Sequence, residues 1–505
     1  MHTLSARSLC WTRRLRLAPT CLLAWTLWAM ACGSSPTTNP NLDGKRSAAA
    51  PEGQILVMQA TSDVPALDVW IDGQRLVQGL APRRSSRFLA LPPGSHKLEV
   101  RLPSDGGTDM PLWSGGIYLQ DGQRVLACVL GRAADSAITA SPTRLNVIAE
   151  PLSPAQPGQL PLRLLHASPA LGAVDIVDGD SGEPPLLAAA PYSRFSSYVD
   201  VGKRVMAPGL LLRQTGERFD LGTLSTQPIQ QAGVDGHAQT AILLGETNPL
   251  AADTARLDAL LLDETSGELR DLSLQPYERS PKSTLYVLNA SPDAGPIDVY
   301  STVNGARLLG GLDYRQATSL LELVPTSYSL EVRQASLPTV LLRTSLRLWP
   351  NQHWAVYLGG RKQGGAPSLH LVALPRARTT TAQTQRRGVF AIADGSKDLR
   401  MTLATAAGPS FVDPVPYGGA SAYRMGDLSA EPLRLGISGS KQQWEIDMPQ
   451  PVIDAAAKQI LALYLTGTLT DPRAPLSALA VLESTASPSQ AALVVSLRTA
   501  ALPSP

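Results

Sequence analysis

The 505-residue sequence has little charge and few aromatic side chains. Charged residues make up 17% of it and the formal net charge is +2, so we expect no broad basic surface and no nucleic-acid partner. Aromatic residues make up only 5%. Hydrophobic residues reach 44%, which is too many for a disordered chain. Proline (42) and glycine (41) are frequent, and this composition favours short strands joined by turns over long helices.

Cysteine is also scarce, and three of the four cysteines lie near the N-terminus, at Cys10, Cys21 and Cys32. The fourth, Cys128, stands alone in the apolar run RVLACVLG. No intrachain disulfide is therefore expected once the N-terminal cysteines are removed or modified. We expect Cys128 to be a buried thiol rather than a reactive one.

The N-terminus has the pattern of an export signal. Residues 1–20 are basic, and residues 21–31 form an apolar stretch that is too short to span a bilayer as a helix. The segment Ala29-Met30-Ala31-Cys32-Gly33 resembles the lipobox of bacterial lipoproteins, in which the cysteine is acylated. This resemblance implies lipidation of Cys32 and makes the membrane a partner through that lipid. An ordinary signal peptide is the alternative.

The mature chain is expected to lie in the cell envelope and to be almost neutral. The leader holds four arginines and no acidic residue, so its removal lowers the net charge from +2 to −2. Gly33 takes the place of the aspartate that retains many lipoproteins at the inner membrane, and this favours the outer membrane.

Four similar segments recur after the leader, and each opens a unit of roughly 100 residues. They are ILVMQATSDVPALDVWIDG (55–73), LRLLHASPALGAVDIVDG (162–179), LYVLNASPDAGPIDVYSTVNG (285–305) and the weaker VFAIADGSKDLRMTLATAAG (389–408). In the first, Leu67, Val69 and Ile71 alternate with polar or aromatic residues, as in a strand with one face on a core. Only residues 451–465 could be a helix, and their place in the repeat favours a strand for the second half.

The expected architecture is therefore all-β, with four tandem immunoglobulin-like β-sandwich domains behind a leader and tether. The expected segments are a lipoprotein signal peptide (1–31), a flexible tether (32–53), repeat 1 (54–151), repeat 2 (160–275), repeat 3 (283–376), a divergent repeat 4 (387–485) and a C-terminal tail (486–505).

The openings NASPDAGPIDVY and HASPALGAVDIV resemble the start of a bacterial domain family of unknown function, catalogued as number 4397. The resemblance is clear in three units and weaker in the fourth, where Arg400 replaces a shared aspartate. It implies exported, often lipidated, tandem immunoglobulin-like sandwiches. It implies no activity, because a fold alone does not define one.

Candidate catalytic and metal-binding residues do not recur from unit to unit. His166 of the second unit is Gln59 in the first and Asn289 in the third, so a polar residue that hydrogen-bonds a turn is favoured over a general base. The shared Asp68, Asp175 and Asp298 could bind calcium or a partner, but a solvent-facing position or a bond to a neighbouring backbone amide is favoured. We expect no catalytic residue, no cofactor and no metal.

Trp70 and Tyr300 are the candidate partner-facing aromatics, because they occupy equivalent positions on the strand face opposite the core. The same position is Val177 in the second unit and Thr402 in the fourth. The alternative is that these rings cover a joint between domains. Tyr192, Tyr314 and Tyr417 recur before another strand and are expected to pack at a corner.

Three function classes are compatible with this sequence. The favoured hypothesis is a non-enzymatic, lipid-anchored envelope protein that acts as a spacer, adhesin-like module or interaction scaffold, with an envelope protein or glycan as its partner. A glycan- or polymer-binding envelope module is the first alternative. An envelope hydrolase is the second, and it requires a cleft with clustered carboxylates or a histidine-centred triad.

Overall fold

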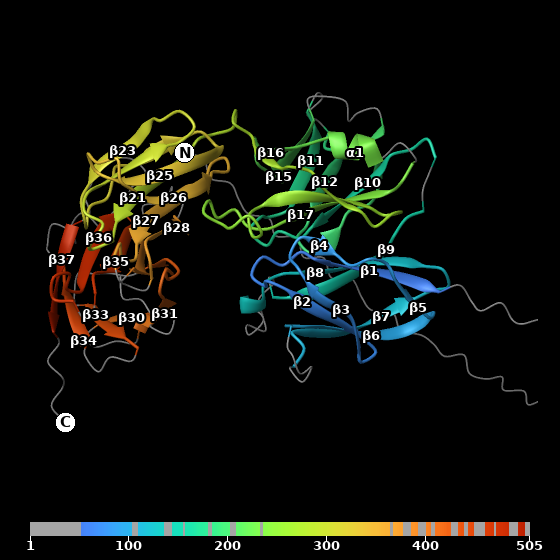
Figure 1. The fold of residues 1–505 in the computed structure, drawn as a ribbon, viewed down its shortest axis with the longest axis horizontal. Helices are drawn as coiled ribbons and strands as arrows, with labels where there is room; N and C mark the ends of the chain where they lie inside the picture. The colour runs from blue at the N-terminus through green and yellow to red at the C-terminus, as the bar shows by residue number, and fades with distance from the viewer. Residues whose placement is uncertain are drawn as a thin grey trace, which may run out of the picture. The chain divides into compact units, whose positions relative to one another are not determined.

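A computed structural model gives the fold (Figure 1). The chain divides into two units, Met1–Ala49 and Ala50–Pro505, and all described residues lie in the second. The structure describes residues 52–103, 110–135, 144–154, 157–179, 184–202, 209–232, 236–363, 367–376, 385–391, 400–405, 410–425, 433–438, 443–448, 460–468, 471–483 and 493–499. The predicted signal peptide, Cys32 and all but the last residues of the tether lie outside these ranges.

Nearly all regular structure is β, which confirms the predicted fold class. The first repeat holds β1 (Gly53–Gln59), β2 (Leu67–Ile71), β3 (Gln74–Leu80), β4 (Arg84–Ser85), β5 (Leu89–Leu91), β6 (Gly94–Arg101), β7 (Trp113–Leu119), β8 (Arg124–Leu130), the 3-10 helix η1 (Ala133–Asp135) and β9 (Asn146–Pro151). The second holds β10 (Pro161–His166), β11 (Val174–Asp178), β12 (Leu187–Ala190), β13 (Arg194–Phe195), β14 (Val199–Asp200), β15 (Leu210–Gln214), β16 (Asp220–Leu224), α1 (Gln227–Ala232), β17 (Gln239–Leu244), β18 (Asp258–Asp263), β19 (Leu269–Asp271) and β20 (Gln275–Pro276).

The third and fourth repeats follow the same plan, and the colour gradient of Figure 1 passes through all four in order. The third holds β21 (Ser283–Asn289), β22 (Ile297–Ser301), β23 (Arg307–Leu312), β24 (Leu321–Leu323), β25 (Ser327–Gln334), β26 (Val340–Arg347), β27 (His353–Gly359) and β28 (His370–Pro375). The fourth holds β29 (Gln385–Phe390), β30 (Arg400–Thr405), β31 (Ser410–Pro416), β32 (Arg424–Met425), β33 (Leu433–Ile437), β34 (Gln443–Asp447), β35 (Leu461–Thr466), β36 (Ser477–Leu482) and β37 (Leu493–Thr499).

Each repeat has two layers of paired strands, which we name the outer and the inner sheet, and in repeat 4 the two are joined through β37. In repeat 1 the outer sheet has the strand order β3-β2-β6-β7 and the inner sheet β4-β1-β8-β9. The first strand of the inner sheet runs parallel to a strand much later in the repeat, as β1 with β8, β10 with β17, β21 with β27 and β29 with β35. The other ladders between named strands are antiparallel, and in repeat 1 all four strands of the outer sheet lie between β1 and β8 in the chain.

The inner sheets are apolar on both faces, and this pairs the repeats. In β1, Ile55 and Val57 belong to the core of repeat 1, whereas Leu56 and Met58 belong to a second core. That second core, which we name the 1·2 interface, also contains Cys128 of β8 and residues of β10, β17 and β18 in repeat 2. The apolar runs in β1 and β8 are therefore continuous because both of their faces are buried.

Repeats 3 and 4 pack together in the same way. The 3·4 interface contains Tyr286 and Tyr357 of repeat 3 together with Tyr464, Leu479 and other residues of repeat 4. Complete burial of one large apolar side chain stabilises a fold by about 1.5–3 kcal/mol, so each interface contributes on the scale of a domain core. Pattern alone had not predicted this pairing.

The C-terminal segment 486–505, expected to be a tail, contributes strand β37 to repeat 4. This strand pairs antiparallel with β34 of the outer sheet and with β36 of the inner sheet, so the nine strands of repeat 4 form one continuous sheet. The second half of 451–465 is strand β35, as expected. No helix among the described residues is both long and apolar enough to cross a membrane.

Candidate functional site

The outer sheet of repeat 1 carries an aromatic ring stacked against arginines. Trp70 on β2 lies opposite Glu99 on β6, and the ring is half-buried. The Arg101 guanidinium lies 4.7 Å and that of Arg75 5.9 Å from the ring centroid. Arg101 also pairs with Glu99 at 2.6 Å, and Arg75 with Asp68 at 3.2 Å. Such cation–π contacts stabilise by about 0.5–1 kcal/mol when exposed, so the ring is held in one orientation.

Repeat 3 carries the same arrangement. Tyr300 on β22 lies opposite Glu331 on β25, with the Arg333 guanidinium 4.5 Å from its ring centroid. Glu331 binds both Arg333 and Arg343. Hydrogen bonds from these arginines lower the pKa of Glu331, as bonds from Lys97 and Arg101 lower the pKa of Glu99. We call Trp70, Arg101 and Glu99, and likewise Tyr300, Arg333 and Glu331, the outward clusters.

Among the residues that the structure describes, the outward clusters occur in repeats 1 and 3. The equivalent of their ring is the buried Val177 in repeat 2 and the half-buried Thr402 in repeat 4. Neither Trp70 nor Tyr300 is part of the described apolar interfaces between repeats, and the arginines on their rings belong to their own repeats. The rings are therefore absent from the described apolar cores of the 1·2 and 3·4 interfaces. That they face a partner stays a prediction.

The arginines and glutamates of these clusters were missed in the sequence, although a signal exists. The tetrapeptide LEVR occurs at 98–101 and again at 330–333. In a strand, the Glu and Arg of this motif lie two residues apart on one face, and here that face is the one that carries Trp70 or Tyr300.

The shared aspartates hold a strand irregularity in place. Asp68 accepts a bond from the backbone N–H of Gly79 at 2.7 Å, and Asp298 from that of Gly311 at 2.8 Å. Asp175 accepts from the N–H of Ala189 at 2.7 Å. Each of these donors has a positive φ (62°, 66° and 50° respectively). The expectation of a bond to a neighbouring amide is confirmed, whereas a solvent-facing position is wrong, because all three aspartates are buried.

The polar residues that end the first strands bond turn carbonyls, as expected. Gln59 donates to Val64 O at 2.9 Å and Asn289 to Gly295 O at 3.0 Å. His166 Nε2 lies 2.8 Å from Gly172 O. All three side chains are fully buried, and burial lowers the pKa of His166. A neutral imidazole here ties a loop to the strand end.

Two buried ion pairs lie beside the interfaces between repeats, and neither was predicted. Arg163 pairs with Glu264 at 3.0 Å in repeat 2, and Arg387 pairs with Glu483 at 2.7 Å in repeat 4. All four side chains are at most 5% exposed. A tyrosine hydroxyl also donates to each glutamate, from Tyr198 and Tyr423 respectively.

The 3·4 pair is joined directly through its buried glutamate. Tyr286 of repeat 3 donates to Glu483 at 2.7 Å, and its hydroxyl lies 2.7 Å from that of Tyr464. Burial raises the pKa of Tyr286 well above its usual value, so this phenol stays a hydrogen-bond donor. In the 1·2 pair, the backbone N–H of Ser153 in the connection donates to Glu264 at 2.9 Å. Both glutamates thus bond a group from the preceding repeat or its connection.

The remaining candidate residues from the sequence, one cysteine and three tyrosines, pack against other side chains of the fold. Cys128 is free and fully buried, and burial raises the pKa of its thiol to about 12, which confirms the expectation. Tyr192 packs at the 1·2 interface against His166. Tyr417 packs on the core of repeat 4, and its hydroxyl lies 3.0 Å from His370 Nε2. The Tyr314 ring lies under Arg315.

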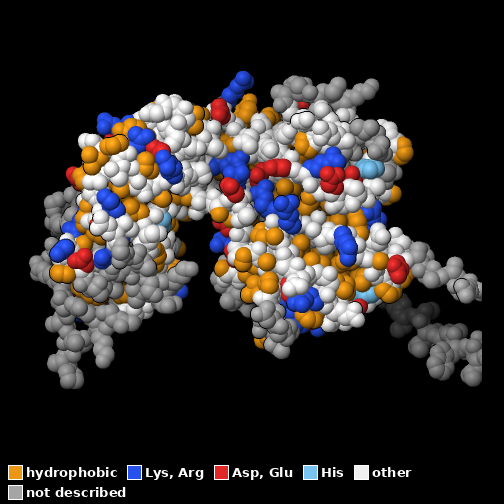
Figure 2. Space-filling model, in the orientation of Figure 1, with side chains coloured by type: hydrophobic (Ala, Val, Ile, Leu, Met, Phe, Trp, Pro, Cys, Tyr) orange, Lys and Arg blue, Asp and Glu red, His pale blue; other side chains and the backbone are white. Residues whose placement is uncertain are grey.

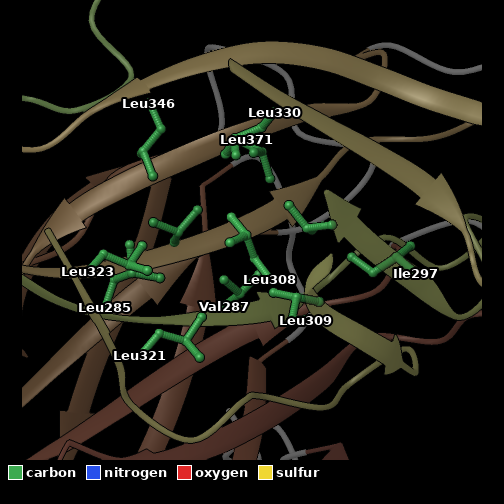
Figure 3. A pocket seen from close by; sticks show the side chains of 12 residues that line it. Leu285, Val287, Ile297, Leu308, Leu309, Leu321, Leu323, Leu330, Leu346 and Leu371 are labelled. Carbon is green, nitrogen blue, oxygen red and sulfur yellow. The ribbon is translucent and has the colours of Figure 1, made fainter. Parts of the chain in front are cut away.

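A small apolar cavity of about 30 Å³ lies in the core of repeat 3 (Figure 3). Its lining is entirely aliphatic and includes Leu346 of β26 and Leu371 of β28. Because the lining has no polar groups, it offers no hydrogen-bond partner to an ordered water. On the surface drawn in Figure 2, basic and acidic side chains are interspersed.

These features define a class of protein: tandem β-sandwiches assembled as paired repeats. Residues 53–177 and 283–391 match the model of Domain of unknown function (DUF4397), and these two matches are consistent with tandem repeats of that domain. Each match spans one odd-numbered repeat and continues into the next, as far as β11 in repeat 2 and β29 in repeat 4. This confirms the resemblance seen in the sequence.

The other comparisons add little. No curated protein matches the chain. Among solved structures, the Bacillus anthracis TIE protein is similar at 7% identity over 74% of this chain, with a TM-score of 0.12. The matched region spans 61% of that protein, so this chain covers less than two thirds of its length.

Proposed function

We propose that this is a non-enzymatic, lipid-anchored protein of the bacterial cell envelope that serves as an interaction scaffold. The observation that carries the proposal is the recurrence of one outward cluster on repeats 1 and 3. Trp, Tyr and Arg are the side chains that contribute most at protein interfaces. The arginine held against each ring fixes it in place before binding, which lowers the entropic cost of association.

A protein partner is favoured over a glycan by the same geometry. Sugar binding needs an open ring face, whereas Trp70 has two guanidinium groups near its ring and Tyr300 has one. The buried polar groups support a non-enzymatic role, because Gln59, His166 and Asn289 each bond a backbone carbonyl of their own repeat. Attachment through Cys32 would place two similar clusters on one tethered chain, and such repetition raises avidity.

The binding role is tested with the ectodomain, residues 52–505, cross-linked to envelope extract from the source bacterium. The captured protein is identified and purified, and its affinity is measured against variant ectodomains. We expect the Trp70→Ala/Tyr300→Ala variant to bind about tenfold or more weakly. Tyr118→Ala is the matched control, because Tyr118 is an exposed aromatic (65%) outside the clusters. Equal affinity of the double variant and the control would refute this role.

The anchor is tested separately by metabolic labelling with palmitate. We expect label on the wild-type protein and none on the Cys32→Ala variant. Equal label on both would exclude lipidation at Cys32. Fractionation of the labelled cells then assigns the protein to the outer or the inner membrane, and the outer membrane is the expected result.

A further inference from the structure

One edge of the outer sheet is formed by β7, β16, β26 or β34 in repeats 1 to 4. In repeats 2 and 4 an additional strand of the same chain pairs with this edge. In repeat 2, β20 pairs with β16 through Gly222 and Thr223. In repeat 4, β37 pairs with four residues of β34 and also with β36 of the inner sheet. In both repeats the covering strand follows the last strand of the inner sheet along the chain.

Repeats 1 and 3 have no such covering strand among the residues that the structure describes. The equivalent strands, β7 and β26, each end their sheet. In repeat 3 the facing inner-sheet strand, β28, likewise pairs only with β27. In both repeats the chain continues from the inner sheet into the next repeat, and no strand in the described part of the chain returns to pair with β7 or β26.

The backbone of β26 shows which groups face the open edge. The N–H of Leu348 bonds Thr326 O towards β25, whereas the N–H of Arg347 bonds Pro249 O on the other side. Backbone groups alternate sides along an antiparallel strand, so Ser345 and Arg343 also face away from β25. Beyond Arg347, no bond to a neighbouring strand covers this side of β26 in the described part of the chain.

The side chains along this edge suit an apolar strand. Leu341 and Leu342 of β26 and Leu369 and Leu371 beside or within β28 are only partly buried, although they pack on the core of repeat 3. The cavity of repeat 3 reaches both strands through Leu346 and Leu371. Arg343 does not block the edge, because its guanidinium is bound to Glu331 over the sheet face at 2.9 Å.

We propose that β26 binds an extended segment of a separate polypeptide by strand addition, in the way that β37 covers β34. The expected ligand is an extended stretch of alternating apolar residues without proline, similar to LVVSLRT at 493–499. Main-chain hydrogen bonds at Arg343 and Ser345 would supply affinity, and the leucines would select apolar side chains. The inference rests on the proposed scaffold function but concerns a different surface from the outward clusters.

The test uses the full ectodomain and a synthetic peptide with the sequence of residues 491–500. Hydrogen exchange with mass spectrometry measures protection of segment 340–347 with and without the peptide. We expect the peptide to slow exchange in this segment. A peptide in which the residue equivalent to Val495 is proline should not slow it. No protection of β26, or protection confined to β34 and β36 by exchange with β37, would overturn the proposal.

Ser345→Pro and Ser345→Ala form the matched variants. Proline removes the N–H that faces the open side, and edge strands tolerate proline there, so the fold should be kept. We expect Ser345→Pro to weaken peptide binding about tenfold or more and Ser345→Ala to leave it unchanged. Equal binding by both folded variants would contradict strand addition. Protection of β26 that rises with protein concentration in the absence of peptide would instead indicate a second copy, and would also contradict it.

A negative result in this test would not contradict the proposed role of the outward clusters. Loss of partner binding in Trp70→Ala/Tyr300→Ala concerns the sheet face, and peptide protection of β26 concerns the sheet edge. The two proposals can therefore fail independently.

Discussion

The carboxylate of Asp68 accepts a hydrogen bond from the backbone N–H of Gly79 at 2.7 Å, and this bond holds Gly79 at a φ of +62° on the adjacent strand. Repeat 3 repeats the relationship with Asp298 and Gly311. Repeat 2 keeps the aspartate but has Ala189 at the irregular position, with a φ of +50°. An equivalent aspartate thus fixes the same strand irregularity in the outer sheets of repeats 1, 2 and 3.

Ala189→Gly should stabilise the protein. A left-handed backbone costs an alanine about 1 kcal/mol more than a glycine, and the greater freedom of glycine when unfolded offsets part of this gain. We expect an increase in the free energy of unfolding of up to about 1 kcal/mol. Ala188→Gly is the control, because Ala188 is also exposed on β12 but has no positive φ, and it should destabilise. Urea denaturation that ranks the two variants the other way would contradict this account.

Breaking the buried ion pair of repeat 4 should be costly. Glu483→Gln leaves Arg387 buried without a charged partner, and loss of one member of such a pair costs about 3–5 kcal/mol. Arg343→Ala provides the comparison, since Arg343 is 73% exposed in its pair with Glu331 and should cost about 1 kcal/mol or less. Thermal unfolding of both variants measures the difference in stability. Equal decreases in stability would show that the buried pair stabilises the fold no more than the exposed pair.

His166 should make the protein sensitive to acid. Burial lowers its pKa in the folded state, so as the pH falls below the ordinary histidine pKa near 6.5, the unfolded state takes up a proton that the folded state does not. Stability is therefore lost as the pH falls, until the folded pKa is reached. His166→Asn substitutes the residue that repeat 3 has at this position, Asn289, and should remove this component. The comparison is the free energy of unfolding at pH 7.5 and pH 5 for both proteins, and identical pH dependence would rule out His166 as the source.

His96 should act in the opposite direction. Burial lowers the pKa of His96, but the hydrogen bond that its ring donates to Asp72 (2.7 Å), the contact with Pro92 O and the charge of Asp72 together raise the pKa above its usual value. Its contribution is complete below the unfolded pKa and is lost as the pH rises through the folded pKa. Asp72→Asn should therefore reduce stability at pH 6 and have less effect at pH 9. A loss that does not change between these pH values would show that the charge of His96 is not involved.

The sequence carried enough information for the strands and the repeats but not for the way the repeats pack. Leu67, Val69 and Ile71 alternate and lie in the core of repeat 1, as the period of two indicates. The run ILVM in β1 has no alternation, because Ile55 and Leu56 lie in different cores. Such a run predicts burial on both faces but does not identify the second partner.

The buried charges and the last strand were beyond pattern analysis for a similar reason. Arg163 and Arg387 stand in apolar first strands, and their glutamates lie in a late part of the same repeat. Only the three-dimensional register brings them together. The aromatic positions Trp70 and Tyr300 were found from the alternation, whereas Arg101 and Arg333 required comparison of the two LEVR segments. Strand β37 was missed because it lies outside the repeated pattern.

Pairing of the repeats through their inner sheets is the central structural claim, and the reactivity of Cys128 tests it most directly. Cys128 is fully buried at the 1·2 interface, and Ile242 of repeat 2 lies in the same core. A charge at position 242 should open this interface and expose the thiol. Leu479 belongs to the equivalent 3·4 interface, so Leu479→Lys is the matched control.

The measurement is the rate at which a water-soluble disulfide reagent modifies Cys128 in the native ectodomain. The account predicts negligible modification of the wild type and of Leu479→Lys, and rapid modification of Ile242→Lys while circular dichroism still shows folded sheets. Rapid modification of the native wild type, or a Cys128 that stays protected in Ile242→Lys, would contradict the pairing.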